Sequence, residues 1–159
     1  MNCTNLAEML LEAYQDERKA DAFYSNLLAM ADNDFEAVDA LAEARRDERR
    51  HACQIAELYK ELTGQLPPPA SPYPPQADSL IEGIRLAIAD EEHAIEFYKK
   101  IADCTSNPVV VSTMLRIRED ETVHALKFRA LLAELEEEAA EEPEPATTAP
   151  APCDPPVII

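Results

Sequence analysis

The stretch Asp-Glu-Arg-Arg-His at residues 47–51 recurs as Asp-Glu-Thr-Val-His at residues 120–124. A glutamate and a histidine three residues apart share one face of a helix, so each motif directs a carboxylate and an imidazole the same way. The pair Asp16-Glu17 likewise recurs as Asp90-Glu91, 74 residues later. These repeats predict two related helical hairpins that contribute equivalent residues to one site.

Proline positions divide the chain into helical segments. Six of the 13 prolines lie in residues 67–75, six lie in residues 143–156, and the remaining one is Pro108. Because helix interiors exclude proline, the intervals predict four long helices, at about residues 6–31, 35–63 and 79–104, and from residue 108 to a point somewhere after Leu135. Residues favoured at helix ends stand at these boundaries: Asn5, Asp34, Ser79 and Asn107 at the starts, and Gly64 after the second helix.

The predicted fold class is all-α, a four-helix bundle of two related antiparallel hairpins. A Pro-rich connector at residues 65–77 can span roughly 40 Å, at about 3.1 Å per residue, so we expect it to cross over the length of the bundle. Helices two and three then run in the same direction. We expect the bundle domain to occupy residues 1–138. Residues 139–159 are rich in Glu, Pro, Ala and Thr and predict an acidic flexible tail.

Composition excludes several functional classes. The formal net charge of −18 repels nucleic-acid phosphates, and no stripe of Lys and Arg neutralises them. No apolar run of about 18 residues and no secretion signal are found, so we expect a cytoplasmic protein that does not insert in membranes. The four cysteines are far apart and form no C-x-x-C pair, which predicts free thiols.

Each predicted helix carries one glutamate in the middle of an otherwise apolar face. Histidines follow one turn later on helices two and four. The six residues are Glu17, Glu48, His51, Glu91, Glu121 and His124. Four carboxylates in one apolar core cost several kcal/mol each and repel one another, unless cations lie among them. Two divalent ions balance the four charges, and mixed carboxylate and imidazole donors suit iron or manganese better than magnesium or calcium.

Four further residues are candidates for supporting these ligands. Asp47 and Asp120 precede their histidines by four residues and can accept the outer imidazole N–H across the bundle, which would fix the ring orientation. Tyr24 and Tyr98 lie two turns after the glutamate of their own helix. Each hydroxyl can hydrogen-bond a ligating carboxylate near the reacting centre, and the alternative for each is an ordinary core tyrosine.

These motifs resemble the rubrerythrin branch of the ferritin-like superfamily, the non-haem proteins with two irons in a helical bundle, over about residues 5–135. The resemblance implies that the six residues bind two iron ions per chain. It also implies reduction of hydrogen peroxide, a defence against oxidative stress, with electrons from an external donor such as a rubredoxin-like protein. Rubrerythrins carry an extra carboxylate one turn after the ligand of the third helix, where this chain has Ala94.

Alternatives remain open on the sequence alone. The set of four Glu and two His is also similar to the iron-oxidising centre of bacterioferritins, which implies a ferroxidase or iron buffer. A third possibility is a redox-silent interaction protein, stapled by a metal for which zinc would serve as well. We expect peroxide or dioxygen as the reacting partner, and a homodimer as the assembly.

Overall fold

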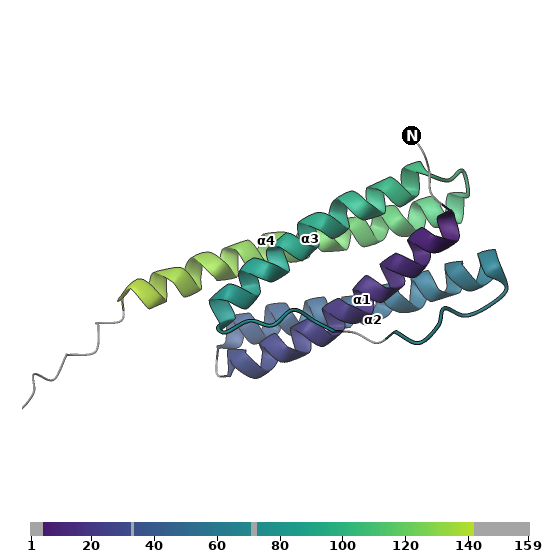
Figure 1. Ribbon diagram of the computed structural model, residues 1–159. Coiled ribbons are helices and arrows are strands. Elements are labelled where there is room, and N and C mark those ends of the chain that lie inside the picture. Colours follow the sequence, from purple (N-terminus) through teal and green to yellow (C-terminus); the bar gives the residue numbers. More distant parts are fainter. Residues whose placement is uncertain (1–4, 33, 71–72, 142–159) are drawn as a thin grey trace, which may run out of the picture.

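The computed structural model describes residues 5–32, 34–70 and 73–141, and this part of the chain contains four helices and no strand. The helices are α1 (Leu6–Ala31), α2 (Phe35–Thr63), α3 (Leu80–Asp103) and α4 (Pro108–Glu141). Figure 1 shows them as one elongated bundle. The predicted all-α class is confirmed.

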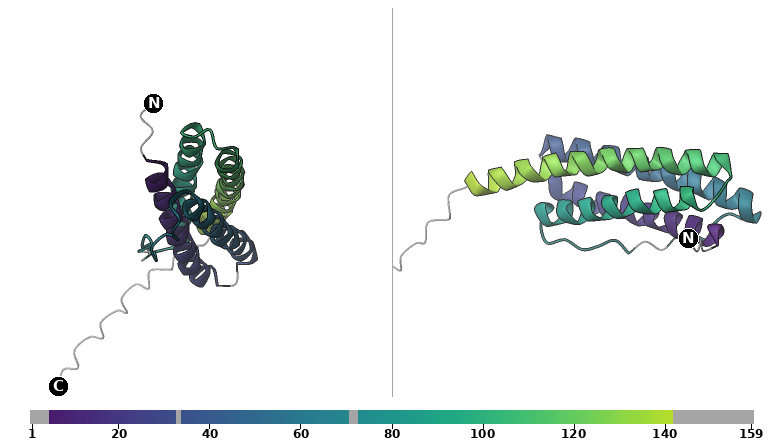
Figure 2. Two further views of the ribbon diagram at one scale, coloured as in Figure 1. Left: turned by 90° about the vertical axis from the view of Figure 1, so that its right-hand side faces the viewer. Right: turned by 90° about the horizontal axis from the view of Figure 1, so that it is seen from above.

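The helices pair as two hairpins. α1 packs along α2 and α3 packs along α4, whereas α2 faces α4 and α1 faces α3 across the bundle. The end-on and top views in Figure 2 show the same arrangement. In Figure 1 the described parts of the connector, residues 65–70 and 73–79, run along the outside from the end of α2 to the start of α3. α2 and α3 therefore point the same way.

Local chemistry accounts for the helix ends. All four predicted N-terminal caps accept a backbone N–H from the first turn of their helix, as Asp34 does from Ala37 at 2.9 Å. Gly64 ends α2 with a φ of 78°, which glycine adopts without strain, and its N–H donates to the Lys60 carbonyl.

α4 ends after Leu135, as the sequence predicts. The helix continues to Glu141, past the expected domain boundary at residue 138. Residues 136–141 are all Glu or Ala, which favour helix, and the next proline in the sequence is Pro143. Most of the predicted tail, residues 142–159, lies outside the described residues.

Two apolar clusters fill the core, one toward each end of the bundle. The first contains Leu10, Ile55, Ile101 and Met114, and the second contains Leu27, Leu41, Ile84 and Phe128. The six predicted ligands lie at mid-helix, between these clusters, and are only 0–3% exposed. The bundle therefore encloses a polar layer between two apolar ones.

The expectation of four free thiols is wrong. Cys53 on α2 is an exposed free thiol, but Cys104 after α3 is disulfide-bonded. Cysteines that are far apart in the sequence can lie close together in the fold, so their spacing did not predict the disulfide of Cys104. Cys3 and Cys153 lie outside the described residues.

Within the described ranges, no helix combines the length and the apolar character needed to cross a membrane.

Candidate metal centre

The six predicted ligands meet in the polar layer and form two overlapping groups of four. The first group is Glu17, Glu48, His51 and Glu121, and the second is Glu48, Glu91, Glu121 and His124. Within each group the donor atoms all lie within 4.8 Å of one another. Glu48 and Glu121 belong to both groups. The geometry thus describes two adjacent groups of possible cation ligands that share two carboxylates.

Both histidines direct the Nδ1 atom into this layer. Nδ1 of His51 lies 2.9 Å from Oε1 of Glu121 and 3.6 Å from Oε2 of Glu17. Nδ1 of His124 lies 2.9 Å from Oε2 of Glu121 and 3.5 Å from Oε1 of Glu48. The two oxygens of Glu121 therefore approach different histidines, as expected for a carboxylate that bridges two cation positions.

The outer nitrogen of each histidine contacts an aspartate from the other hairpin. Nε2 of His51 on α2 lies 3.1 Å from Oδ2 of Asp120 on α4. Nε2 of His124 on α4 lies 3.2 Å from Oδ2 of Asp47 on α2. A carboxylate acceptor favours the proton on Nε2, which leaves the lone pair of Nδ1 facing the cation positions.

The two tyrosines also reach across the hairpins. The hydroxyl of Tyr24 on α1 donates to Glu91 on α3, and the hydroxyl of Tyr98 on α3 donates to Glu17 on α1. Burial, reinforced by the charge of the glutamate that each contacts, raises the pKa of both tyrosines well above the usual value. Both hydroxyls consequently stay protonated and act as donors, so neither residue is an ordinary core tyrosine.

The site holds protons when no cation compensates its charge. Burial opposes charging of His51 and His124, but hydrogen bonds with Glu121 and other carboxylates outweigh it and raise their pKa values to about 11 and about 10. Burial, followed by the charge of Glu121, raises the pKa of Glu48 well above its usual range and that of Glu91 to about 8. Cations entering this layer would displace such protons.

Unpaired polar atoms test whether the layer fits a metal. When each histidine is neutral with its proton on Nε2, Nδ1 and the carboxylate oxygens that face it are all acceptors. Among the described residues, the buried side-chain nitrogen and oxygen atoms then without a hydrogen-bond partner are Glu17 Oε2, Glu48 Oε1, His51 Nδ1 and Glu121 Oε1. All four belong to the proposed ligands. Burying such atoms without a partner is costly and rare, so a ligand that binds carboxylate and imidazole together is expected here. The donor set fits a pair of iron or manganese ions.

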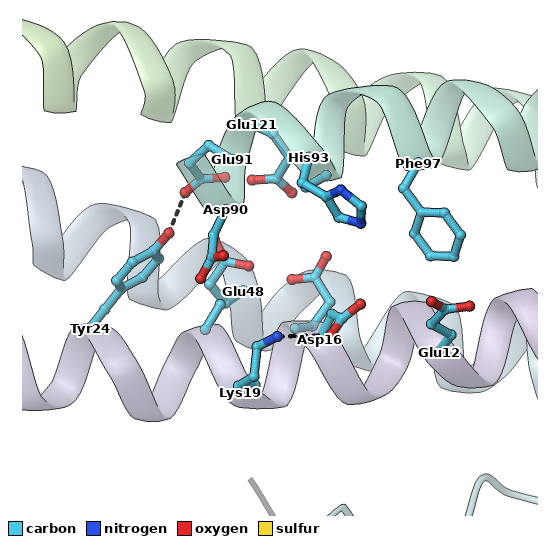
Figure 3. A pocket seen from close by; sticks show the side chains of 13 residues that line it. Glu12, Asp16, Lys19, Tyr24, Glu48, Asp90, Glu91, His93, Phe97 and Glu121 are labelled. Carbon is cyan, nitrogen blue, oxygen red and sulfur yellow. Dashed lines mark hydrogen bonds and ion pairs between the residues drawn. The ribbon is translucent and has the colours of Figure 1, made fainter. Parts of the chain in front are cut away.

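A cavity of about 240 Å³ opens between α1 and α3 onto the carboxylates (Figure 3). Ala20 and Ala94, at equivalent positions of the two helices, leave this space unfilled. Charged groups line the opening, and Lys19 donates to Asp16 at 3.1 Å. His93 is exposed and its ring stacks on Phe97. The cavity gives a small molecule or ion a direct route to the polar layer.

Comparison with known proteins assigns the family. Residues 8–132 match the family described as Rubrerythrin. The chain belongs to the rubrerythrin family. The Bacillus subtilis (strain 168) protein YhjR, described as uncharacterized, is 32% identical over 131 residues, which cover 81% of this chain and 88% of YhjR. The resemblance read from the paired motifs is thereby confirmed, and the family together with the carboxylate and histidine cluster suggests a di-iron protein.

Two solved structures share the rubrerythrin-family fold of this chain. One is a two-domain protein from Anabaena variabilis with DJ-1/ThiJ/PfpI-like and ferritin-like domains. Its TM-score is 0.71 at 18% identity, and the match covers 91% of this chain but only 40% of that protein. The other is the conserved hypothetical protein Rv2844 from Mycobacterium tuberculosis, with a TM-score of 0.70 at 16% identity, covering 89% of this chain and 95% of that one. At these identities the two matches support the ferritin-like fold of this chain and say nothing of its activity.

An ionic cluster that was not predicted from the sequence lies next to the site. Asp21, one turn after Glu17, is buried, and its Oδ1 accepts hydrogen bonds from Nε of Arg45 at 3.0 Å and from Nε of Arg49 at 2.9 Å. The two arginines are four residues apart on α2, a spacing that places both on one face. That spacing was the available signal in the sequence. The cluster joins α1 to α2 beside the polar layer.

Proposed function

We propose that this chain is a non-haem di-iron oxidoreductase that reduces hydrogen peroxide or dioxygen with electrons from an external donor, such as a rubredoxin-like protein. The observation that carries the proposal is that Glu48 and Glu121 belong to both donor groups. Two shared carboxylates would hold two metal ions close enough to act together on one small oxidant.

When bound, a pair of ferrous ions supplies two electrons, the number needed with two protons to convert one peroxide into two waters. The chain's own residues position the ligating carboxylates and exclude water from the site. Tyr98 and Tyr24 hold the outer carboxylates Glu17 and Glu91, and the apolar clusters at both ends of the bundle exclude water. The cavity between α1 and α3 admits a small oxidant to the remaining open side.

Ferroxidase or iron-buffering activity is the second candidate. The acidic lining of the cavity favours it, because Glu12, Asp16 and Asp90 lie where an ion would enter. Carboxylates at an opening raise the local concentration of cations. The same donor groups would then bind ferrous ions as substrate and release them after oxidation.

Electron counting separates the two candidates. Protein purified without oxygen is analysed for metal, loaded with ferrous ion and titrated with peroxide, then with dioxygen. The oxidoreductase is expected to consume one peroxide per pair of ions and stop, to resume when a reductant is supplied, and to retain about two irons per chain after repeated ferrous additions. Accumulation of tens of ferric ions per chain without reductant would instead identify a ferroxidase store.

A redox-inert replacement supplies the control for this experiment. Protein loaded with zinc should bind the same number of ions but consume no peroxide, because zinc has no accessible second oxidation state. Peroxide consumption by the zinc form would contradict the proposed chemistry.

A further inference from the structure

Arg50 on α2 contacts the two aspartates that hold the histidines. Its Nη1 lies 2.6 Å from Oδ1 of Asp47, and its Nη2 lies 2.8 Å from Oδ2 of Asp120. Those aspartates accept from His124 and His51 respectively. One guanidinium on the surface of the bundle therefore connects, through two carboxylates, to the ligating imidazoles of both cation positions.

We propose that Arg50 is a positioning residue for both histidines: by holding Asp47 and Asp120 it directs the Nδ1 atoms of His124 and His51 into the two cation positions. The inference rests on the proposed metal-binding function and adds a residue that shapes both halves of the site at once. Arg50 itself touches none of the glutamate ligands in the described structure.

The geometry at Asp120 shows how this positioning works. Nη2 of Arg50 and Nε2 of His51 are 3.5 Å apart, and both approach the same oxygen of Asp120. A guanidinium has no acceptor, so the imidazole proton on Nε2 can point only to the aspartate. The planar fork of arginine also fixes the angle between its two carboxylate partners, which a lysine ammonium does not.

The aspartates depend on Arg50 because they are partly open to solvent. The side chain of Asp47 is 18% exposed and that of Asp120 is 34% exposed, so either can rotate toward water when its partner is removed. In the part of the chain that the structure describes, Arg50 is the one lysine or arginine within 4.0 Å of either aspartate. The equivalent position on α4 is the exposed Val123, so the second hairpin supplies no substitute.

Cobalt(II) binding to the full chain tests the inference. We expect Arg50→Gln to weaken binding of both Co(II) ions by about tenfold, the lower end of the effect of changing a group behind a metal ligand. Asp47→Asn and Asp120→Asn should each weaken mainly one ion, and adding Arg50→Gln to the double variant should change little further. Arg50→Lys, which keeps the charge but not the fork, should restore only part of the loss.

Arg49→Gln is the matched control. Arg49 is the neighbouring residue, carries the same charge and pairs with Asp21 rather than with either aspartate of the site. We expect it to leave Co(II) affinity within about twofold of the parent, the usual scatter around a neutral surface change. Equal losses in Arg49→Gln and Arg50→Gln would mean that general charge or stability, and not positioning, sets the affinity, and would overturn the inference.

Proton NMR of the cobalt form gives a readout that a purely structural role would not move. The exchangeable N–H protons of two ligating imidazoles should be shifted by the paramagnetic ions, and Arg50→Gln should move both signals and speed their exchange with solvent. Unchanged signals would refute positioning by Arg50 while leaving the proposed function intact. Failure of the parent chain to bind two Co(II) ions would overturn the proposed function together with this inference.

Discussion

The two hairpins supply equivalent metal donors, but the residues that surround these donors differ between them. Each offers two glutamates, one histidine, one aspartate and one tyrosine at equivalent positions. Outside that set, the first hairpin buries Asp21 against Arg45 and Arg49. At the corresponding place of the second, Arg118 donates instead to the backbone carbonyl of Ile95. Both hairpins must supply the same donors, because they contribute to one site. The residues around the donors only have to hold the two helices of each hairpin together, so they can differ.

The same contrast appears on the histidine side of the bundle. Arg50 on α2 bridges the aspartates of both hairpins, while its counterpart Val123 on α4 lies exposed. One arginine is sufficient because its fork spans both carboxylates. An approximately symmetric site can therefore rest on an asymmetric support.

The largest effect is expected from the shared carboxylates. Glu48→Ala and Glu121→Ala should each abolish most of the metal-dependent stabilisation, because each residue serves both cation positions. That stabilisation is about 4 kcal/mol for each bound ion when free metal exceeds its dissociation constant a thousandfold. Glu17→Ala and Glu91→Ala should lose roughly half, since each serves one position. Apo Glu48→Ala should be no less stable than the apo parent, because burial and the charge of Glu121 make the Glu48 carboxylate costly to bury. Apo Glu121→Ala should be less stable, because it removes the carboxylate that both histidines contact.

Thermal melts with metal and with chelator measure this difference. Equal losses from Glu17→Ala and Glu48→Ala would contradict the sharing of Glu48 between the two donor groups. A melting temperature that ignores chelation in the parent would remove the argument that cations compensate the buried charge.

The second prediction concerns the ionic cluster that distinguishes the hairpins. Asp21→Asn should destabilise the apo protein by about 1–3 kcal/mol, since it leaves two arginines without their buried partner, and their partial exposure reduces the cost. Arg118→Gln in the second hairpin should cost less, about 1 kcal/mol, because it removes one hydrogen bond to a carbonyl. Urea unfolding compares the two variants. An equal or larger loss from Arg118→Gln would show that the hairpins are held together by similar means.

The third prediction uses the equivalent alanines of the cavity. Ala20→Leu or Ala94→Leu should slow the reaction with peroxide by roughly tenfold, because the larger side chain occupies the route between α1 and α3. Metal content should stay at the parent value. Stopped-flow rates report the reaction, and Ala29→Leu, exposed on α1 outside the cavity, is the control. Unchanged rates in both cavity variants would place the route of the oxidant elsewhere.

The smallest effects are expected at the tyrosines. Tyr24→Phe and Tyr98→Phe each remove one hydrogen bond to a glutamate of the other hairpin, and each should cost about 1 kcal/mol of apo stability. Chemical denaturation of both variants measures the cost. Similar values would support equivalence of the two halves, whereas a large loss in one and none in the other would show that a single hydroxyl carries the contact.

Much of the fold follows from local signals in the sequence. The bounds of α1 and α2 match the prediction, because Asn5 and Asp34 cap the two starts and Gly64 ends α2, and these residues act through neighbouring backbone groups. The periodicity of apolar residues likewise placed the six proposed ligands on inward faces. The end of α4 could be predicted only as lying after Leu135, because a run of good helix formers continues the helix past the last residue of its apolar stripe.

The sequence by itself determined which face of each helix turns inward, because helical periodicity is a property of residues a few positions apart. Only the tertiary structure decided which residues meet across the bundle. Each tyrosine bonds the glutamate of the other hairpin, and Arg50 reaches a carboxylate 70 residues away. Such pairings depend on how two preformed hairpins dock. No local pattern specifies the docking, because it is set by the packing of both apolar clusters at once.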